Sequence, residues 1–526
     1  MSHEPMLLPR VNIASLSSIV TASILMVSCP PRPGFAVEAA VLLSQALGLN
    51  RGQPGLDFVD INLDTDTPLF LDPAAFYEGE GRFAEQCSRD LEEFFDAVLH
   101  AAGERDWNLG LRLLRGLSEP DEIHLGFSAG KPAGRGIGEQ QARQIFSAIL
   151  ASRAISTGLI RDLNDTLMFI PGIGPDKVSD ITTNVLRRRL ITYTQEQFEL
   201  LGVAIENEMP TGLLWDGIKS DWTETYDYIP VIKGEKILLV PKRYVKYATD
   251  FTRASQQYYD GYVASFIRQR ELATMGKLVK FREWSDDHQE PWVYKEDIER
   301  EVPRHKNSVA DFSIQNPQVY DRFKDAFFKF DPMSVHAIVA AQGQFFDEQA
   351  YAERMIVALG AVPTGARSAS DYQSLIVGIL HFVFYPNLTH PVLERSINQD
   401  RKRIDISFDN SAHRGLFERL RNDPFLLARE VMVECKNYTH DLSNPEIDQM
   451  IGRFDPRRGR FGIVVCRDVC DKDRLVERCT DAFRSQQGVV VVLTDADLTH
   501  ALRGNPAGRE IRLAEIIQHQ LREQRS

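Results

Sequence analysis

The sequence has few cysteines, and their spacing is not that of a structural zinc site or a disulfide framework. None of the six forms a CxxC pair, and none lies near two histidines at the spacing of zinc ligands. Structural zinc sites and disulfide frameworks both depend on such clusters. We therefore expect neither, and the scattered thiols favour the reducing cytoplasm over a secreted location.

Long hydrophobic runs are also missing, so we expect a soluble chain with no membrane partner. One stretch, VNIASLSSIVTASILMVSC, follows Arg10 and could be mistaken for a secretion signal. It is interrupted by Asn12 and by repeated Ser and Thr, and Glu4 precedes it, which a signal usually lacks. A buried strand or helix, a mis-assigned start and a signal or lipoprotein segment remain alternatives for residues 1–30.

An excess of positive charge is absent. The net charge of −13 argues against a protein that coats nucleic acid over its whole surface. Residues 371–526 hold 23 Lys plus Arg and 23 Asp plus Glu, so the excess of acids lies in residues 1–370. The bases of the balanced part form two clusters, which are Arg401, Lys402, Arg403 and Arg453, Arg457, Arg458, Arg460. Either they are solvated surface, or Arg403, Arg453, Arg457 and Arg458 bind nucleic-acid phosphates.

A P-loop is absent as well. The glycine-rich segment GFSAGKPAGRGIG (126–138) fails the GxxxxGK[ST] spacing, because Gly126 and Gly130 are too close and Pro132 follows the lysine. An ordinary surface loop is the favoured interpretation. A loop that senses a ligand or contacts nucleic acid is the alternative.

The segment PGIG (171–174) resembles the hairpin of a helix-hairpin-helix, in which glycine amides at a helix start meet a DNA phosphate. Asp176 stands where that motif more often has a base. A plain helix start, with Arg187 to Arg189 near the C-terminal end of the helix, is the alternative.

At 526 residues the chain is longer than one core usually supports, so we expect two or three domains. After the N-terminal extension (1–30), residues 31–245 mix helical periodicity, as in 83–104, with β-like runs such as 236–245. This mixture predicts an α+β domain for regulation or target recognition, with a partner protein or ligand. Residues 246–365 have charged helical segments and little strand signal, which predicts a helical connector.

From residue 366 onward, helices and strands alternate, which predicts an α/β domain with a mixed central sheet flanked by helices. The expected elements are a helix (370–384), strands (403–408 and 429–438), a helix (445–454), a strand (461–466), a helix (472–487), a strand (488–495) and a terminal helix.

Two charges interrupt an otherwise apolar strand of this domain. Because side chains alternate along a strand, Glu434 and Lys436 project from one face about 6.6 Å apart, and Val433 and Cys435 project from the other. Asp405 alternates with isoleucines in the preceding strand, and antiparallel pairing would bring it near Glu434. Two carboxylates that close need a cation between them, and oxygen ligands suit Mg²⁺ or Mn²⁺.

This order of elements and charges resembles the PD-(D/E)xK nuclease superfamily, whose members share the restriction-endonuclease-like fold. The resemblance covers residues 366–526, less than a third of the chain. It implies a catalytic set of Asp405, Glu434, Lys436 and Gln449. It further implies a metal held by Asp405, Glu434 and the Cys435 carbonyl, with Lys436 near the nucleophilic water.

Some positions depart from the family pattern. The segment between the acids is long and is predicted to contain an extra helix, HRGLFERLRND, so Asp409 is an alternative first ligand. The first helix offers only Asp371 or Gln373 where many members have Glu. A buried ion pair between Glu434 and Lys436, or an exposed edge strand, would explain the same charges without catalysis.

Together these features predict a cytoplasmic, metal-dependent endonuclease that hydrolyses DNA. By analogy of fold it acts in restriction or anti-phage defence, and by analogy with enzymes that cut both strands it forms a homodimer. The alternatives are a catalytically inactive nucleic-acid-binding or scaffold protein that retains the fold, and a nuclease that cleaves RNA.

Overall fold

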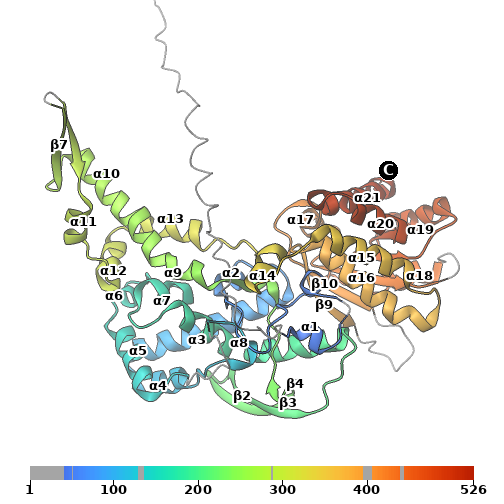
Figure 1. The fold of residues 1–526 in the computed structure, drawn as a ribbon, viewed down its shortest axis with the longest axis horizontal. Coiled ribbons are helices and arrows are strands. Elements are labelled where there is room, and N and C mark those ends of the chain that lie inside the picture. The colour runs from blue at the N-terminus through green and yellow to red at the C-terminus, as the bar shows by residue number, and fades with distance from the viewer. Residues whose placement is uncertain are drawn as a thin grey trace, which may run out of the picture. The chain divides into compact units, whose positions relative to one another are not determined.

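The computed structural model describes six stretches of the chain, which are residues 41–49, 51–127, 136–285, 288–394, 405–438 and 444–525 (Figure 1). From residue 41 onward the chain belongs to one compact unit. The predicted extension (1–30), most of the glycine-rich segment and Arg403 lie outside the described residues. None of the described helices is both long and apolar enough to cross a membrane.

The first part of the chain is mostly helical, with strands that pair two by two. Its helices are α1 (Leu43–Ala46), α2 (Pro73–Tyr77), α3 (Arg82–Gly103), α4 (Trp107–Arg115), α5 (Glu139–Ala151), α6 (Arg153–Ser156), α7 (Leu163–Phe169), α8 (Pro175–Leu200) and α9 (Ala248–Gln257). Its strand pairs are β1 (Leu69–Leu71) with β6 (Val245–Tyr247), β2 (Glu208–Asp216) with β3 (Asp221–Tyr228), and β4 (Val231–Ile232) with β5 (Glu235–Lys236).

Helix α3 confirms the helix predicted at 83–104, and its apolar residues, spaced by three or four, are buried on one side. The strand predicted at 236–245 is wrong between its end residues, because only Lys236 (β5) and Val245 (β6) lie in strands. Ile237 to Val240 are buried, but their backbone bonds go to scattered partners, such as Leu238 N to Glu122 O at 2.8 Å. An apolar segment can therefore cross a core without joining a sheet.

The predicted connector is largely helical. Besides α9, it contains α10 (Ala264–Thr274), α11 (Lys295–Glu301), α12 (Lys306–Gln315), α13 (Pro317–Phe327), α14 (Val335–Ala341) and α15 (Glu348–Ala361). The weak strand signal missed the antiparallel hairpin of β7 (Val279–Ser285) and β8 (His288–Val293), which follows α10 (Figure 1). This hairpin is rich in charged residues and packs on α10, so it needs no long apolar run.

The C-terminal part is an α/β structure, as predicted. Its elements are α16 (Ala369–Phe384), β9 (Leu388–Glu394), β10 (Asp405–Asn410), α17 (Gly415–Asn422), β11 (Glu430–Lys436), α18 (Asn444–Ile451), β12 (Phe461–Cys466), α19 (Lys472–Arg484), β13 (Val489–Thr494), α20 (Asp495–Arg503) and α21 (Arg509–Arg525). The five strands lie in the order β13-β12-β11-β10-β9. Strand β10 is antiparallel to β9 and β11, whereas β11, β12 and β13 are parallel.

The sheet has two different faces. Val431 and Val433 face a large apolar core that also contains residues of α16, α20 and α21. Met432 faces a smaller apolar cluster with residues of α18 and α19 on the opposite side. A third core, the largest, is formed by residues between Leu43 and Ile338. The predicted domain boundaries stay predictions.

Side-chain amides cover both edges of the sheet. Gln520 of α21 exchanges two hydrogen bonds with the backbone of Val492, at 2.9 and 2.7 Å. Gln524 donates to the backbone carbonyl two residues earlier in β13, at 2.8 Å. At the other edge Gln197 of α8 donates to the carbonyl of Pro391 in β9, at 2.9 Å.

Candidate functional site

The charged residues of β11 lie on the face predicted from the sequence. Val433 belongs to the large apolar core and Cys435 packs against it, which confirms that these two side chains face away from Glu434 and Lys436. Glu434 and Lys436 are each only 2% exposed. Two buried charges require partners, because an unpaired charge in a protein interior is strongly destabilising.

Those partners come from the helix that follows. The Lys436 ammonium contacts Oε1 of Glu434, and Arg453, just after α18, donates to Oε2 at 2.5 Å. Gln449 of α18 accepts a hydrogen bond from Lys436 at 3.5 Å. The structure thus brings together Glu434, Lys436 and Gln449. It adds Arg453, which was predicted for phosphate contact and here pairs with a carboxylate.

Strand register indicates which aspartate accompanies Glu434. Strand β10 pairs with β11 so that Ile406 lies opposite Val433 and Asp409 opposite Glu430. One residue further, the same register brings the backbone of Asp405 opposite Glu434; the side chain of Asp405 lies outside the described residues. The alternative ligand Asp409 is four residues along the strand, about 13 Å away at the usual rise.

The side-chain metal ligands predicted from the sequence at the Asp405 end are carboxylates, the ligand type that a hard cation takes. Carboxylates at opposed positions on neighbouring strands supply the oxygen ligands that Mg²⁺ or Mn²⁺ prefers, and water completes such shells. Glu434 is already held by cations, so an ion would take the place of Lys436 or Arg453 on one oxygen. No cluster of three or more His, Cys, Asp and Glu side chains suited to a metal occurs within the described ranges.

Asp409 binds the start of helix α3. Its Oδ2 accepts a hydrogen bond from the backbone N–H of Phe83 at 3.0 Å, in the first turn of α3. A carboxylate there satisfies an amide that has no partner within the helix and is favoured by the helix dipole. Asp409 also lies 3.6 Å from Nδ1 of His390 in β9, and Nε2 of His390 lies 2.8 Å from Glu196 of α8, so these contacts join the sheet to the first part of the chain.

The protonation of His390 follows from these neighbours. Burial favours the neutral ring, but hydrogen bonds to Asp409 and to Glu196, the latter at 2.8 Å, outweigh burial and raise the pKa of His390 to about 10. Opposite Asp409, burial and the nearby Asp409 charge raise the pKa of Glu430 to about 7. Both pKa shifts depend on charged side chains that other segments of the chain bring close.

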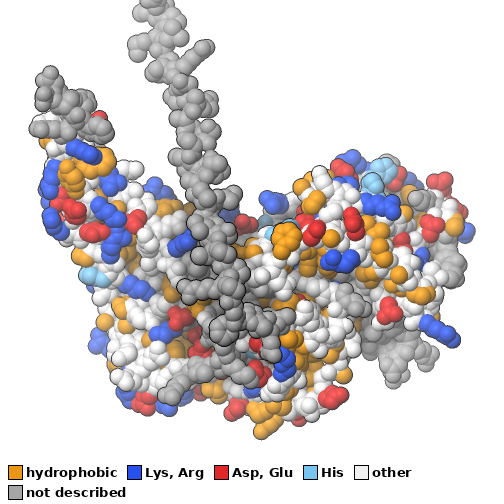
Figure 2. All heavy atoms as spheres, viewed as in Figure 1, with side chains coloured by type: hydrophobic (Ala, Val, Ile, Leu, Met, Phe, Trp, Pro, Cys, Tyr) orange, Lys and Arg blue, Asp and Glu red, His pale blue; other side chains and the backbone are white. Residues whose placement is uncertain are grey.

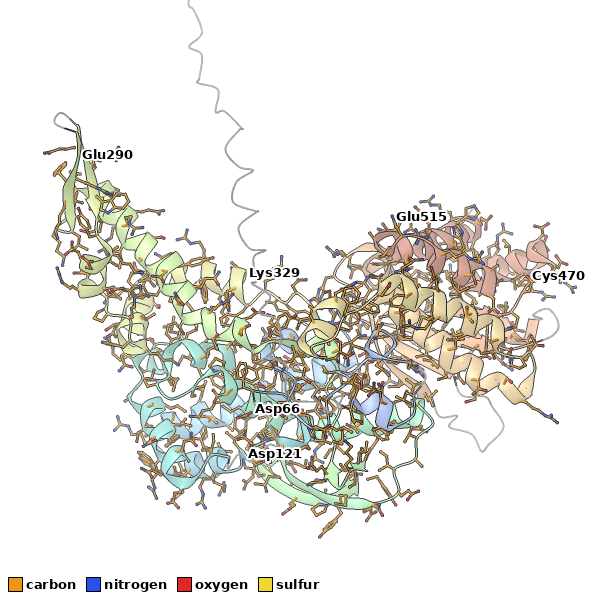
Figure 3. The ribbon with its side chains drawn as sticks, viewed as in Figure 1. Asp66, Asp121, Glu290, Lys329, Cys470 and Glu515 are labelled. Carbon is orange, nitrogen blue, oxygen red and sulfur yellow. The ribbon has the colours of Figure 1, made fainter. Side chains whose placement is uncertain are left out.

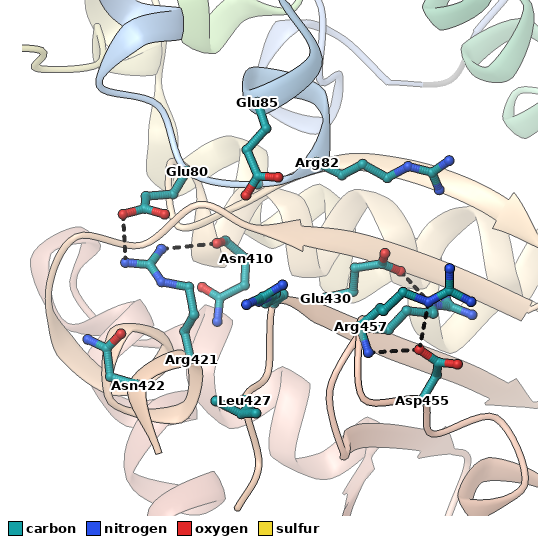
Figure 4. A pocket seen from close by; sticks show the side chains of 13 residues that line it. Glu80, Arg82, Glu85, Asn410, Arg421, Asn422, Leu427, Glu430, Asp455 and Arg457 are labelled. Carbon is teal, nitrogen blue, oxygen red and sulfur yellow. Dashed lines mark hydrogen bonds and ion pairs between the residues drawn. The ribbon is translucent and has the colours of Figure 1, made fainter. Parts of the chain in front are cut away.

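Two cavities adjoin this part of the sheet. One, of about 950 Å³, lies between the start of α3, β11 and the loop after α18 (Figure 4). The other, of about 490 Å³, lies between α3, α8 and strands β9 and β10, and both are lined by Arg82, Glu430 and Arg458. Among the predicted phosphate contacts, Arg458 pairs with Glu430 at 2.7 Å, whereas the Arg457 side chain is 91% exposed.

The segment PGIG, which resembles a helix-hairpin-helix, forms a turn between helices α7 and α8. Its carbonyls are already bound: Lys306 donates to Ile170 and Ile173, and Lys177 to Gly172. The predicted helix end at Arg187 to Arg189 is wrong, because α8 continues to Leu200 through further buried residues.

Acidic side chains surround the start of α8. Asp176 and Asp180 line a cavity of about 460 Å³ together with Asp66 and Glu119. Burial and the charges of Glu119 and Asp176 raise the pKa of Asp180 to about 8, and Asp66 lies close to Asp121 (Figure 3). Such surroundings repel phosphate, so they favour the interpretation as a plain helix start.

Sequence reasoning missed Arg82, His390 and Glu430. Glu430 precedes Glu434 by four residues, so the strand period alone places both on one face. No comparable signal exists for Arg82, which shares a cavity with the distant Glu430, or for His390, whose partner Glu196 is 194 residues away.

Comparison with known proteins adds one finding. Residues 48–252 match a family described as a domain of unknown function (DUF8370). No curated protein and no solved structure matches the chain. The match covers the part that supplies α3 and α8, but not the sheet that carries Glu434.

Proposed function

We propose that this chain is a metal-dependent nuclease of the PD-(D/E)xK type that hydrolyses DNA phosphodiester bonds. The observation that carries the proposal is the meeting of Glu434, Lys436 and Gln449 beside the strand position of Asp405. The mixed sheet flanked by helices supports the proposal, since the resemblance implies a domain of this class. A role in restriction or anti-phage defence is proposed by analogy of fold alone.

Asp405, Glu434 and the Cys435 carbonyl would hold Mg²⁺ or Mn²⁺. Such an ion lowers the pKa of bound water and stabilises charge on the phosphate. Lys436 would donate hydrogen bonds that orient the attacking water, and Gln449 accepts a hydrogen bond from the same ammonium. Arg453 holds the second oxygen of Glu434, so it positions the carboxylate.

Cleavage of supercoiled plasmid DNA with Mg²⁺ tests the proposal. We expect nicked or linear product from the purified protein and none from Glu434→Ala or Lys436→Ala. Glu139→Gln, at an exposed acid of α5, is the matched control. Thermal unfolding of each variant shows whether it is folded. Equal cutting by the wild type and both site variants would refute the assignment.

One observation favours a second candidate, a nucleic-acid-binding or scaffold protein without catalysis. Both oxygens of Glu434 are paired with cationic side chains, as in a purely structural ion-pair cluster. This candidate predicts salt-sensitive DNA binding without divalent metal and no cleavage of plasmid under any condition. Incubation of a labelled RNA under the conditions of the cleavage assay tests whether RNA is the substrate.

A further inference from the structure

The two cavities form a cleft between regions that are far apart in the sequence. Gly81 and Arg82 at the start of α3 form one side, and Glu430 of β11 forms the other. Arg82 extends over the strands on the side of Glu430 and Arg457 (Figure 4). One side therefore lies within the matched family segment 48–252 and the other on the strand that carries Glu434.

The charges in the larger cavity are not fully compensated. Three of its five arginines are near acids: Arg421 is 3.4 Å from Glu80, and Arg457 and Arg458 face Asp455 and Glu430. The other two, Arg82 and Arg429, have exposed side chains and no ion pair with any residue that the structure describes. Two guanidinium groups in this cavity are thus available to an anion.

Phosphate is the anion that such groups suit best, because the planar guanidinium donates two parallel hydrogen bonds to it. The volume of about 950 Å³ exceeds what one phosphate needs and lies at the upper end of the range for ligand pockets. On the face shown in Figure 2, basic and acidic side chains are interspersed, so a polyanion needs a local cleft rather than a general basic surface.

The distance of the cleft from Glu434 along β11 corresponds to a few nucleotide steps of DNA. Glu430 and Glu434 project from the same face of β11, four residues apart, which is about 13 Å. That distance is about four nucleotide steps along a duplex axis, at 3.4 Å per step. A duplex with one phosphate at Glu434 would therefore have other phosphates at the distance of the cleft.

We propose that this cleft holds the phosphate backbone of the DNA and that the family segment 48–252 forms one of its walls through Arg82. The inference rests on the proposed function, because it takes DNA at Glu434 as its starting point. It assigns the first part of the chain a direct contact with substrate.

Anisotropy of a fluorescein-labelled 30-bp duplex, measured in EDTA over a series of salt concentrations, tests the inference without cleavage. We expect Arg82→Gln and Arg429→Gln each to weaken binding about 5- to 10-fold and to lower the salt slope by about 1. Glu85→Gln removes an exposed acid from the same cavity and should strengthen binding, a gain that misfolding cannot produce. Arg253→Gln, an exposed arginine on α9 outside both cavities, is the control.

Unchanged affinity in Arg82→Gln and Arg429→Gln, or a wild type that does not bind the duplex, would overturn the inference. Its failure can be told apart from failure of the proposed function. If the wild type cuts plasmid but the arginine variants bind normally, only the cleft assignment is lost. If the arginine variants bind weakly but the wild type never cuts, the cleft stands and the nuclease assignment is lost.

Discussion

The paired strands β10 and β11 carry acidic residues at both ends, and the partners of these acids differ. At one end, Glu434 is paired with Lys436 and Arg453, which come from its own strand and from the segment just after α18. At the other end, Asp409 and Glu430 are paired with His390 and Arg458, and Asp409 also binds the first turn of α3. Similar acids thus form a candidate reaction site at one end and a joint between distant segments at the other.

The largest expected effect concerns the Glu434 end. Lys436→Met keeps the length of the side chain but removes the ammonium that is proposed to orient the water. We expect the single-turnover rate of plasmid cleavage to fall about 1,000-fold, within the range usual for loss of a proton-handling group. A rate within a factor of ten of the wild type would place the chemistry elsewhere.

The next effect concerns the Asp409 end. Asp409→Ala removes the N-terminal partner of α3 and leaves His390 with one acid fewer, so we expect a loss of about 3 kcal/mol in the free energy of unfolding. Urea denaturation measures it. Asp64→Ala, at an exposed acid paired with Lys233, should cost less than about 1 kcal/mol. Equal costs in the two variants would contradict the proposed joint.

The joint should also depend on pH. Because the pKa of His390 is raised to about 10, the folded state keeps a proton that the unfolded chain loses above about pH 6.5. Its contribution is complete below pH 6.5 and is lost as the pH approaches 10. We expect His390→Gln to cost about 2 kcal/mol less at pH 9.5 than at pH 6.5, by urea denaturation.

Another buried group titrates in the same range. Burial lowers the pKa of Lys242 to about 7, so it opposes His390 as the pH rises. Lys242 is present in both proteins, so the difference between wild type and His390→Gln isolates the histidine. A difference that is the same at both pH values would show that His390 is neutral in the fold.

The smallest expected effect sharpens the role of Arg453. As a positioning residue it should affect turnover rather than substrate binding, so Arg453→Gln should lower kcat about 5-fold with little change in KM. Arg453→Lys keeps a cation near Glu434 and should restore most of the loss. An equal loss in both variants, or a change in KM alone, would instead make Arg453 a phosphate contact.

Much of the C-terminal sheet could be predicted from the sequence, because buried parallel strands read as apolar runs, as in FGIVVC and VVVVLT. Glu434 and Lys436 stood out because they break such a run. Strand β9 was missed because LTHPVLE contains a histidine and a proline and does not alternate. The contact between Phe83 and Asp409 joins positions 326 residues apart, so no local pattern could predict it.

The glutamines at the sheet edges bear on how two copies could assemble. Unpaired edge strands are where a second chain adds by extending a sheet. Gln520 and Gln524 occupy the backbone groups of β13, and Gln197 occupies one on β9, so continuous pairing across either edge would first displace a helix. If cutting both strands of a duplex requires two copies, we expect them to meet through helices or loops, with the two sheets kept separate.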